Sequence, residues 1–536
     1  MSQRSKLRSI MTGLFAGLLC TAALGTGPVA AESILRRSVV GEPNSLDPTR
    51  VNTGGQFTLR DLYEGLTIYN AAGEIVPGAA ESWTVSPDGL VYTFKLRANG
   101  KWSDGSPVTA QDFVYSLRRL QDPKTTALYP DLLYPIKNAE KINKGQLPLD
   151  QLGVRAIDDR TLEIALERPT SYLLNLLAHH FTLPVNRASI EKNGADFVKP
   201  GQMVSNGAFR LVGHVSNDSM TLVKNDQYWD ANNVKLDKVI YYPITEQAAL
   251  LRRFEAGEMD MVFNFAASDL ARLRETYGKQ VHIAPVLRTI YYVFDTRKAP
   301  FNDKRVRQAL SMVVDRDFLA DSIYYGAAKP TYSFIPPGIP SYGKPSEPDY
   351  VALSQIDRED KAAELMKQAG YGPGGKTLDI TIRHNTDSNV ERVATAIANT
   401  WKKEFNANVK LHNLDAASHY SYLQQGGSFE VAANSSLCDY PDAENFLALA
   451  MSTSKTYNYS RYANPEYDRL MAASYAELDP AKRSQIMHKA ESIFMDDQAI
   501  MPLLNPTDLW LVASRVHGYE DNVANVHLSK FISVQN

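Results

Sequence analysis

The sequence predicts a mixed α/β fold, and three observations carry that prediction. Residues 377–440 alternate short apolar runs with longer segments of helical spacing, in the order strand, helix, strand, helix, strand. Residues 92–96 alternate apolar and polar side chains, which is typical of a half-buried strand. Residues 109–112 fit a capping box, which opens a helix. Sheets and helices are therefore expected in both the early and the late part of the chain.

The first thirty-one residues have the features of a secretory signal. Basic residues at positions 4, 6 and 8 precede an apolar stretch at 10–24, and Val29-Ala30-Ala31 suits a cleavage site. That stretch is shorter than the roughly 20 residues of a spanning helix. Leu19 precedes Cys20, where a lipoprotein signal would have a small residue. We therefore expect a soluble protein that is exported through a cleaved signal, without a lipid anchor.

The composition is that of an ordinary globular protein. Its 536 residues predict two or three domains, and the formal net charge is −3 with no basic stripe suited to nucleic acid. If Cys20 leaves with the signal, Cys438 is a single thiol that cannot form an internal disulfide. It is expected to be a small buried apolar group.

Several other elements can be placed along the chain. A short strand is expected at 35–40, and the capped helix should run from 109 to about 120 with Phe113 and Leu117 on its inner face. Val306, Leu310, Val313 and Phe318 predict one amphipathic helix after Asn302. Another helix near 359–369 should end at Gly370, and the proline- and glycine-rich residues 334–348 should form a surface loop.

Residues 377–440 point to a binding site. Strands are expected at 378–382, 409–411 and 429–433, with helices at 390–405 and 416–425, which implies a parallel sheet with right-handed crossovers. Ligands of such sheets gather beyond the carboxyl ends of the strands. The residues that follow the last strand include Ser435, Ser436, Cys438, Asp439 and Tyr440.

Two acids in this region have different expected roles. Asp442 precedes a short helical segment, so its default role is an N-cap. Asp439 has no such local role, and a carboxylate at the floor of a cleft could pair with an incoming ammonium group.

Other motifs favour structural interpretations. Residues 370–377 match the P-loop string, but a helix precedes the loop and a strand follows it, the reverse of what phosphate binding needs. His179 and His180 have no neighbouring ligand cluster, so no metal site is expected there. The tyrosine pairs at 241–242 and 291–292 are expected to line a core.

Several segments, taken in order, resemble the family 5 solute-binding proteins of ABC importers, specifically the oligopeptide-binding branch with its murein peptide-binding relatives. They cover nearly the whole expected mature chain: 44–48, 60–66, 80–113, 205–209, 300–307 and 438–440. The resemblance implies a periplasmic binding protein type II-like fold, with two lobes around a cleft. It also implies three domains: domain I from residues 32–64, 189–290 and 507–536, domain II from 65–188, and domain III from 291–506.

The resemblance also implies roles for single residues. Asp439 matches the residue that pairs with the amine of a peptide, and Asn434, Ser435, Ser436 and Cys438 match a strand beside the ligand main chain. Tyr129 matches a cleft tyrosine, Asn52 takes the place of a ligand-facing acid, and Tyr440 completes the segment beside Asp439. Gln424, Ala433 and Val390 stand where relatives have groups that hold the ligand carboxylate, and Arg288 or Arg383 are candidates to replace them. Arg288 and Leu437 occupy the two positions of a disulfide found in some members.

The predicted function is therefore that of the periplasmic binding component of an ABC importer. It would capture oligopeptides, including murein peptides, as a monomer, and deliver them to a permease at the inner membrane. Neither an enzymatic activity nor a cofactor or metal is expected. One alternative is a receptor for a non-peptide solute such as an opine, a metal chelate or a glycoside. Another is a secreted hydrolase, which would need a nucleophile–base pair or a metal cluster that the sequence does not offer.

Overall fold

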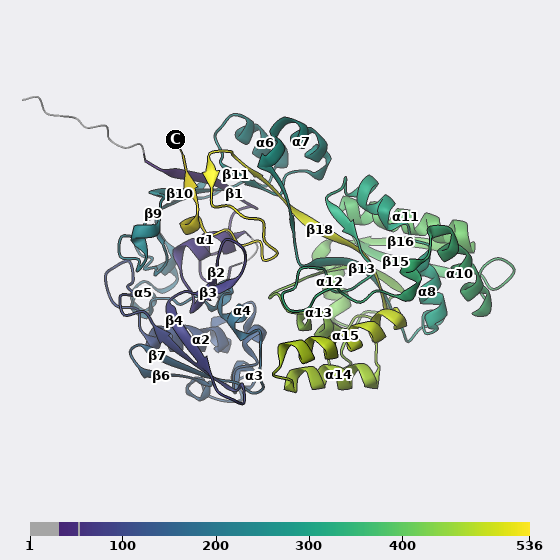
Figure 1. Ribbon diagram of the computed structural model, residues 1–536, viewed down its shortest axis with the longest axis horizontal. Coiled ribbons are helices and arrows are strands. Elements are labelled where there is room, and N and C mark those ends of the chain that lie inside the picture. Colours follow the sequence, from purple (N-terminus) through teal and green to yellow (C-terminus); the bar gives the residue numbers. More distant parts are fainter. Residues whose placement is uncertain (1–31, 52–53, 536) are drawn as a thin grey trace, which may run out of the picture. The chain divides into compact units, whose positions relative to one another are not determined.

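The protein has a mixed α/β fold in the computed structural model, which describes residues 32–51 and 54–535 (Figure 1). The predicted secretory signal at 1–31 and the predicted ligand-facing Asn52 lie outside these ranges. Within them, twelve strands form one large sheet, in the order β16-β15-β17-β13-β18-β11-β1-β10-β9-β8, with β12 and β14 both paired to β18. The predicted fold class is confirmed.

The strands of the large sheet come from distant parts of the sequence. They are β1 (Ile34–Val39), β8 (Phe209–Val215), β9 (Ser219–Lys224), β10 (Lys238–Pro243), β11 (Met261–Phe263), β12 (Val281–Pro285), β13 (Arg288–Phe294), β14 (Ala328–Pro330), β15 (Asp379–Asn385), β16 (Asn408–Leu414), β17 (Val431–Leu437) and β18 (Ile500–Val512). The strand expected at 35–40 is β1, and the tyrosine pairs fall in β10 and β13.

A four-stranded antiparallel sheet lies in the first third of the chain. Its order is β4-β5-β7-β6, with β4 (Ala80–Val85), β5 (Val91–Leu96), β6 (Val154–Asp158) and β7 (Thr161–Ala165). The predicted alternation holds in β5, where Tyr92, Phe94 and Leu96 are buried. The smaller strand pairs are β2 (Thr67–Tyr69) with β3 (Ile75–Pro77), and β19 (Val516–His517) with β20 (Ser533–Val534).

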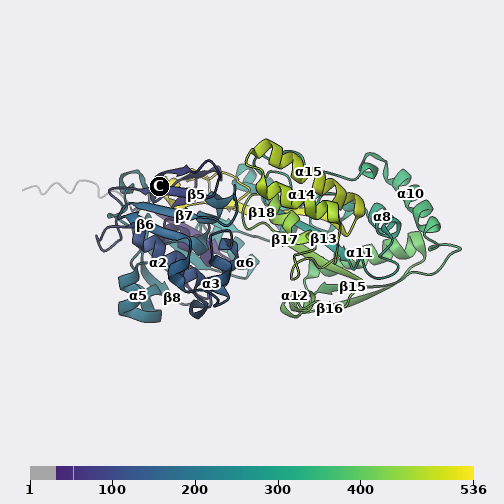
Figure 2. The same cartoon turned by 90° about the horizontal axis from the view of Figure 1, so that it is seen from below.

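The helices cover these sheets. Those of the first half are α1 (Gly55–Leu62), α2 (Ala110–Gln121), α3 (Ala139–Asn143), α4 (Leu173–Leu177), α5 (Arg187–Asn193), α6 (Gln247–Glu255) and α7 (Leu270–Tyr277). Those of the second half are α8 (Lys304–Met312), α9 (Arg316–Phe318), α10 (Gln355–Gln368), α11 (Ser388–Phe405), α12 (Ala416–Gln424), α13 (Glu444–Leu447), α14 (Pro465–Ala476) and α15 (Pro480–Asp497). α14 and α15 lie side by side (Figure 1, Figure 2).

The predicted capping box of α2 is present. The amide of Thr109 donates to the Asp112 carboxylate at 2.8 Å, and Phe113 and Leu117 are buried on the inner face. A Pro or a longer apolar residue at position 109 would remove this cap and cost about 1 kcal/mol. The helix expected near 359–369 is α10, and Gly370 follows it with a left-handed φ of 83°.

The expected helix after Asn302 is broken into two. α8 ends at Met312, and the carboxylate of Asp315 caps the new start by accepting the amide of Phe318 at 2.9 Å. Because α9 is a separate helix, Phe318 does not continue the apolar face of α8. It is 49% exposed and does not lie on the buried face with Val306 and Leu310. The expectation of a single amphipathic helix was therefore wrong.

The strand–helix–strand–helix–strand prediction is confirmed at residues 379–437. β15 pairs in parallel with both β16 and β17, and the connecting helices are α11 and α12. Val393, Ile397 and Trp401 form the buried stripe of α11.

The last strand of this unit extends further than expected. β17 runs to Leu437, because it pairs in antiparallel register with β13 along its whole length. Asn434, Ser435 and Ser436 therefore lie within the strand, and only Cys438, Asp439 and Tyr440 follow it. The expectation that the two serines lie beyond the strand end was wrong.

Buried apolar side chains gather in separate cores. One joins β1, β5 and α2; another joins α8, α10, α11 and β17; a third lies under α14 and α15. β18 crosses between regions of the sheet, since its first half pairs with β13 and β14 and its second half with β11 and β12. The division into three domains and two lobes stays a prediction.

Candidate functional site

The strand β17 has one edge that is only partly covered. On one side β13 pairs with all seven residues, from Val431 to Leu437. On the other side β15 reaches only Val431 and Ala432. Within the described ranges, residues 433–437 thus have no strand partner on the β15 side. Such an edge offers main-chain N–H and C=O groups to an additional extended chain.

The odd-numbered residues of β17 direct their main-chain N–H and C=O groups toward this free edge. The amide of Cys438 donates to the carbonyl oxygen of Leu287, on the β13 side, at 2.8 Å. Because the main-chain groups of successive strand residues face opposite sides, those of Ser435 and Leu437 face away from β13. Local contacts use part of the edge: the Ala433 carbonyl lies 2.9 Å from His419 Nε2, and the Ser435 amide donates to Asn434 Oδ1 at 2.8 Å. The main-chain N–H and C=O groups of Leu437 have no hydrogen-bond partner among the described residues.

Asp439 follows this edge by two residues and has no cationic partner. Within the described chain, no Lys, Arg or His nitrogen forms an ion pair with it, and Asn445 is its polar neighbour, accepting the Asp439 amide at Oδ1 at 3.1 Å. The side chain reaches solvent, yet the surrounding protein displaces enough water to raise its pKa to about 6. The charge of Asp131 raises this pKa further, whereas a hydrogen bond from Asn445 lowers it.

The surroundings of Asp439 contain an acid, Asp131, and two tyrosines, and in the part of the chain that the structure describes no basic side chain forms an ion pair with that acid. Tyr129 and Tyr457 are each 45% exposed, and the charge of Asp439 contributes to the raised pKa of each phenol after burial. The Tyr129 ring packs on Phe181 with 4.5 Å between centroids. Sequence reasoning found Tyr129 but missed Asp131 and Tyr457, which come from segments far apart in the chain.

The loop that carries Asp439 is held from two sides. Tyr440 is buried, and its ring stacks on Tyr172 at 4.4 Å between centroids. Asp442 accepts two hydrogen bonds from Arg483 of α15, at 2.8 and 2.9 Å, and also accepts the amide of Glu444 at the start of α13. The predicted capping role of Asp442 is confirmed. These contacts fix the loop without engaging the Asp439 carboxylate.

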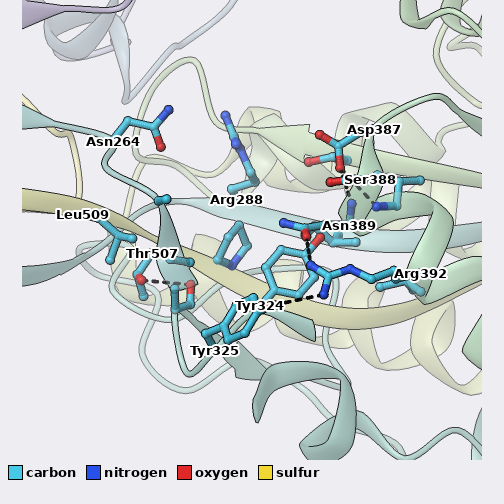
Figure 3. A pocket seen from close by; sticks show the side chains of 18 of the residues that line it. Asn264, Arg288, Tyr324, Tyr325, Asp387, Ser388, Asn389, Arg392, Thr507 and Leu509 are labelled. Carbon is cyan, nitrogen blue, oxygen red and sulfur yellow. Dashed lines mark hydrogen bonds between the residues drawn. The ribbon is translucent and has the colours of Figure 1, made fainter. Parts of the chain in front are cut away.

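A pocket of about 680 Å³ opens next to β17 (Figure 3). Its walls come from segments that are distant in sequence: the start of β13, the start of α11, the middle of β18 and residues 264–268. Ala433, Asn434 and Ser435 form part of its lining. The pocket therefore borders the free edge of β17.

Three charged groups of this pocket have neighbours within the protein. Arg392 donates to the phenol oxygen of Tyr325 at 3.3 Å and to the carbonyl oxygen of Ile323 at 3.1 Å. Asp387 caps α11 by accepting the amides of residues 389 and 390. Burial raises the pKa of Asp508 to about 6, and the nearby charge of Arg288 opposes that rise.

The remaining predicted site residues lie in different surroundings. The Asn434 side chain is buried and donates to Tyr291 OH at 2.8 Å, and Ser436 is also buried. The Cys438 thiol donates to the Tyr440 carbonyl oxygen at 2.5 Å, and burial raises its pKa. Gln424 is exposed on α12 and is not among the residues that line the pocket. Their roles in ligand binding stay predictions.

Comparison with known proteins assigns the chain to a family. The model for bacterial extracellular solute-binding proteins, family 5 (middle region), matches residues 74–458. The chain belongs to this family. Family members are binding proteins, which agrees with a site built from an open strand edge and a carboxylate that forms no ion pair within the described residues.

Relatives within the family cover nearly the whole chain. The periplasmic murein peptide-binding protein MppA of Escherichia coli (strain K12) is 38% identical over 505 residues, 94% of this chain and 93% of that protein. The periplasmic oligopeptide-binding protein OppA of Salmonella typhimurium (strain LT2) is 35% identical over 547 residues, the full length of both. The solved structure of MppA in its unliganded open form has a TM-score of 0.84 at 37% identity, covering 94% of this chain and 98% of that one.

Neither a metal-binding cluster nor a membrane-spanning helix is found among the described residues. Among the residues that the structure describes, no cluster of three or more His, Cys, Asp or Glu side chains could hold a metal ion. None of the described helices is both long and apolar enough to cross a membrane. His179 and His180 form a largely buried pair whose pKa values are lowered by burial and by the charge of Arg60.

Proposed function

We propose that this protein captures peptides in the periplasm, in extended form, for delivery to the permease of an ABC importer. The observation that carries the proposal is a carboxylate, Asp439, at the end of a free strand edge, which has no cationic partner among the described residues. The names of its relatives, which bind oligopeptides and murein peptides, support the same ligand class. We further propose that it is exported through cleavage of residues 1–31, acts as a monomer and has no enzymatic activity.

The free edge of β17 can pair with the main-chain N–H and C=O groups of a bound peptide. Each N–H or C=O group of a buried peptide that lacks a hydrogen-bond partner would cost about 1–3 kcal/mol. An added strand along residues 433–437 would satisfy those groups whatever the peptide side chains are. Recognition of the main chain therefore supports a receptor with broad sequence tolerance.

Asp439 would fix the position and direction of the peptide. A terminal ammonium beside it would form a charge-assisted hydrogen bond and relieve the unfavourable isolation of this carboxylate. With its amine at Asp439, the peptide would run along Leu437 and then Ser435, antiparallel to β17. Its following residues would enter the pocket that Ala433 and Ser435 line.

The first experiment identifies the ligand and tests the carboxylate. Mass spectrometry of small molecules released from denatured protein should detect peptides with a free amine. Asp439→Asn, which keeps the size of the side chain, should weaken peptide binding by about 2–5 kcal/mol, because the buried ammonium loses its charge partner. Calorimetry with trialanine measures this change.

The control variant is Asp360→Asn. Asp360 is an exposed acid of α10 that does not line the pocket, so its replacement changes the net charge equally without touching the site. Release of only sugars or metal chelates, or an unchanged affinity of Asp439→Asn, would contradict the proposed function.

A further inference from the structure

Arg288 lines the pocket, and its guanidinium has no ion-pair partner among the described residues. It is the first residue of β13, it is half-buried, and its side chain projects from the strand into the pocket (Figure 3). Within residues 32–51 and 54–535, its guanidinium forms no hydrogen bond and no ion pair with a side chain or carbonyl group. A guanidinium carries five N–H donors in a planar fork suited to a carboxylate.

The acids of the pocket do not neutralise this charge. Asp387 is committed to capping α11 through two amides. The charge of Arg288 partly offsets the rise that burial causes in the pKa of Asp508, yet the two side chains form no ion pair at 4.0 Å or less. The other cation of the pocket, Arg392, is already held by Tyr325 and the Ile323 carbonyl group. Arg288 is thus the guanidinium of the pocket that is free to bind an anion.

The alternative cation, Arg383, has a different position. Its guanidinium lies over the ring of Tyr422, 3.9 Å from the centroid, and the residue is not part of the pocket lining. The two arginines, which the sequence left as equal candidates, are therefore distinguished by geometry. Arg383 provides a control, because it is an arginine of the same sheet that does not line the pocket.

The register of the sheet relates Arg288 to the proposed amine site. Arg288 pairs directly with Leu437, two residues before Asp439. Directly opposed residues of an antiparallel pair project to the same face of the sheet. Ser435 and Ile290 form the next pair on this face, and both line the pocket. A cation and an anion thus flank the same end of the free edge.

We propose that Arg288 binds a carboxylate of the ligand within this pocket. The proposal rests on the proposed function, since the ligand is held with its amine at Asp439. The carboxylate comes either from the C-terminus of a short peptide or from an acidic side chain near its amino end. Both sources present the same planar anion to the guanidinium, and the experiment separates them.

The experiment measures the affinity of the full-length mature protein for three probes by calorimetry. They are trialanine, its C-terminal amide, and the amide of Ala-Glu-Ala. Wild-type protein should bind at least one carboxylate-bearing probe about 10- to 100-fold more tightly than trialanine amide, the range of a charge-assisted hydrogen bond. Preference for trialanine identifies the terminal carboxylate, and preference for Ala-Glu-Ala amide identifies the side chain.

Variants then assign this preference to a residue. Arg288→Gln should abolish the preference, Arg288→Lys should restore part of it, and Arg383→Gln should leave it unchanged. Thermal unfolding of each variant confirms that it is folded, which is expected because the guanidinium makes no contact that the fold needs.

The outcomes separate this proposal from the proposed function. If Asp439→Asn weakens all three peptides while Arg288→Gln keeps the wild-type preference, the role of Arg288 is overturned and peptide capture stands. A wild-type protein that binds all three probes equally also overturns it. Failure of the wild-type protein to bind any of them overturns the proposed function and, with it, the role of Arg288.

Discussion

At the scale of the residue, Asp439 combines features that a structural carboxylate does not have. Two other acids of the chain have basic partners: Asp442 pairs with Arg483, and Asp47 pairs with Arg119, whose hydrogen bond and charge lower its pKa despite burial. Asp439 instead has a raised pKa and a neighbouring acid, Asp131. Perturbed carboxylates of this kind gather at functional sites. The sequence already indicated Asp439, because it lacks a capping role.

The raised pKa of Asp439 predicts a pH dependence of binding. The ammonium of a peptide pairs with the ionised carboxylate, and the free protein protonates this group as the pH falls through about 6. The dissociation constant for trialanine should therefore be nearly constant above pH 7 and rise roughly tenfold per unit well below pH 6. Calorimetry between pH 5 and pH 8 measures it.

The Asp439→Asn variant is the control for this pH profile. It has no proton to gain at this position, so its weaker binding should vary much less over the same range. Tyr129 and Tyr457 remain neutral in this window because their pKa values are raised, and the other acid of the surroundings is Asp131, whose pKa is raised by burial. Equal profiles for wild type and variant would exclude Asp439 as the titrating group.

At the scale of the element, β17 shows what the sequence can and cannot predict. Its existence, its parallel neighbours and the helices around them follow from apolar spacing within about sixty residues. Its full length does not, because the extension to Leu437 depends on pairing with β13, whose residues lie more than 140 positions earlier. The sequence did not predict the break between α8 and α9 either. The helical spacing of apolar residues continues across it, whereas the Asp315 cap starts a new helix.

The free edge predicts a specific effect of Leu437→Pro. The Leu437 amide faces the free side of β17 and its side chain is half exposed, so a proline there removes a donor without breaking the β13 ladder. Trialanine affinity should fall about tenfold, the value of one hydrogen bond at the upper end of the usual range. Calorimetry on the folded variant measures this loss.

Leu437→Ala separates the amide from the side chain. It removes the exposed isobutyl group but keeps the donor, so its affinity should stay close to that of the wild-type protein. If Leu437→Ala and Leu437→Pro weaken binding equally, the main chain of β17 is not the recognition element.

At the scale of the whole molecule, the pocket depends on long-range topology. Its walls combine residues 264–268, the start of β13, the start of α11 and residues 506–509 of β18. No local pattern joins these segments, and they meet because β18 pairs with four other strands, β11, β12, β13 and β14. The fold class followed from local periodicity, whereas the pocket and the isolation of Arg288 required the structure.

Binding at this junction should stabilise the molecule as a whole. A ligand that binds only the folded state at about 100 times its dissociation constant adds roughly 2.7 kcal/mol to the free energy of unfolding. Because the pocket joins β13, α11 and β18, trialanine should raise the unfolding temperature of the protein as a unit rather than that of one segment. Differential scanning calorimetry should show the main transition shifted upward, with N-acetylated trialanine as the control that lacks the ammonium. A shift of equal size with the acetylated peptide would mean that the amine contributes nothing to capture, whatever residue lies beside it.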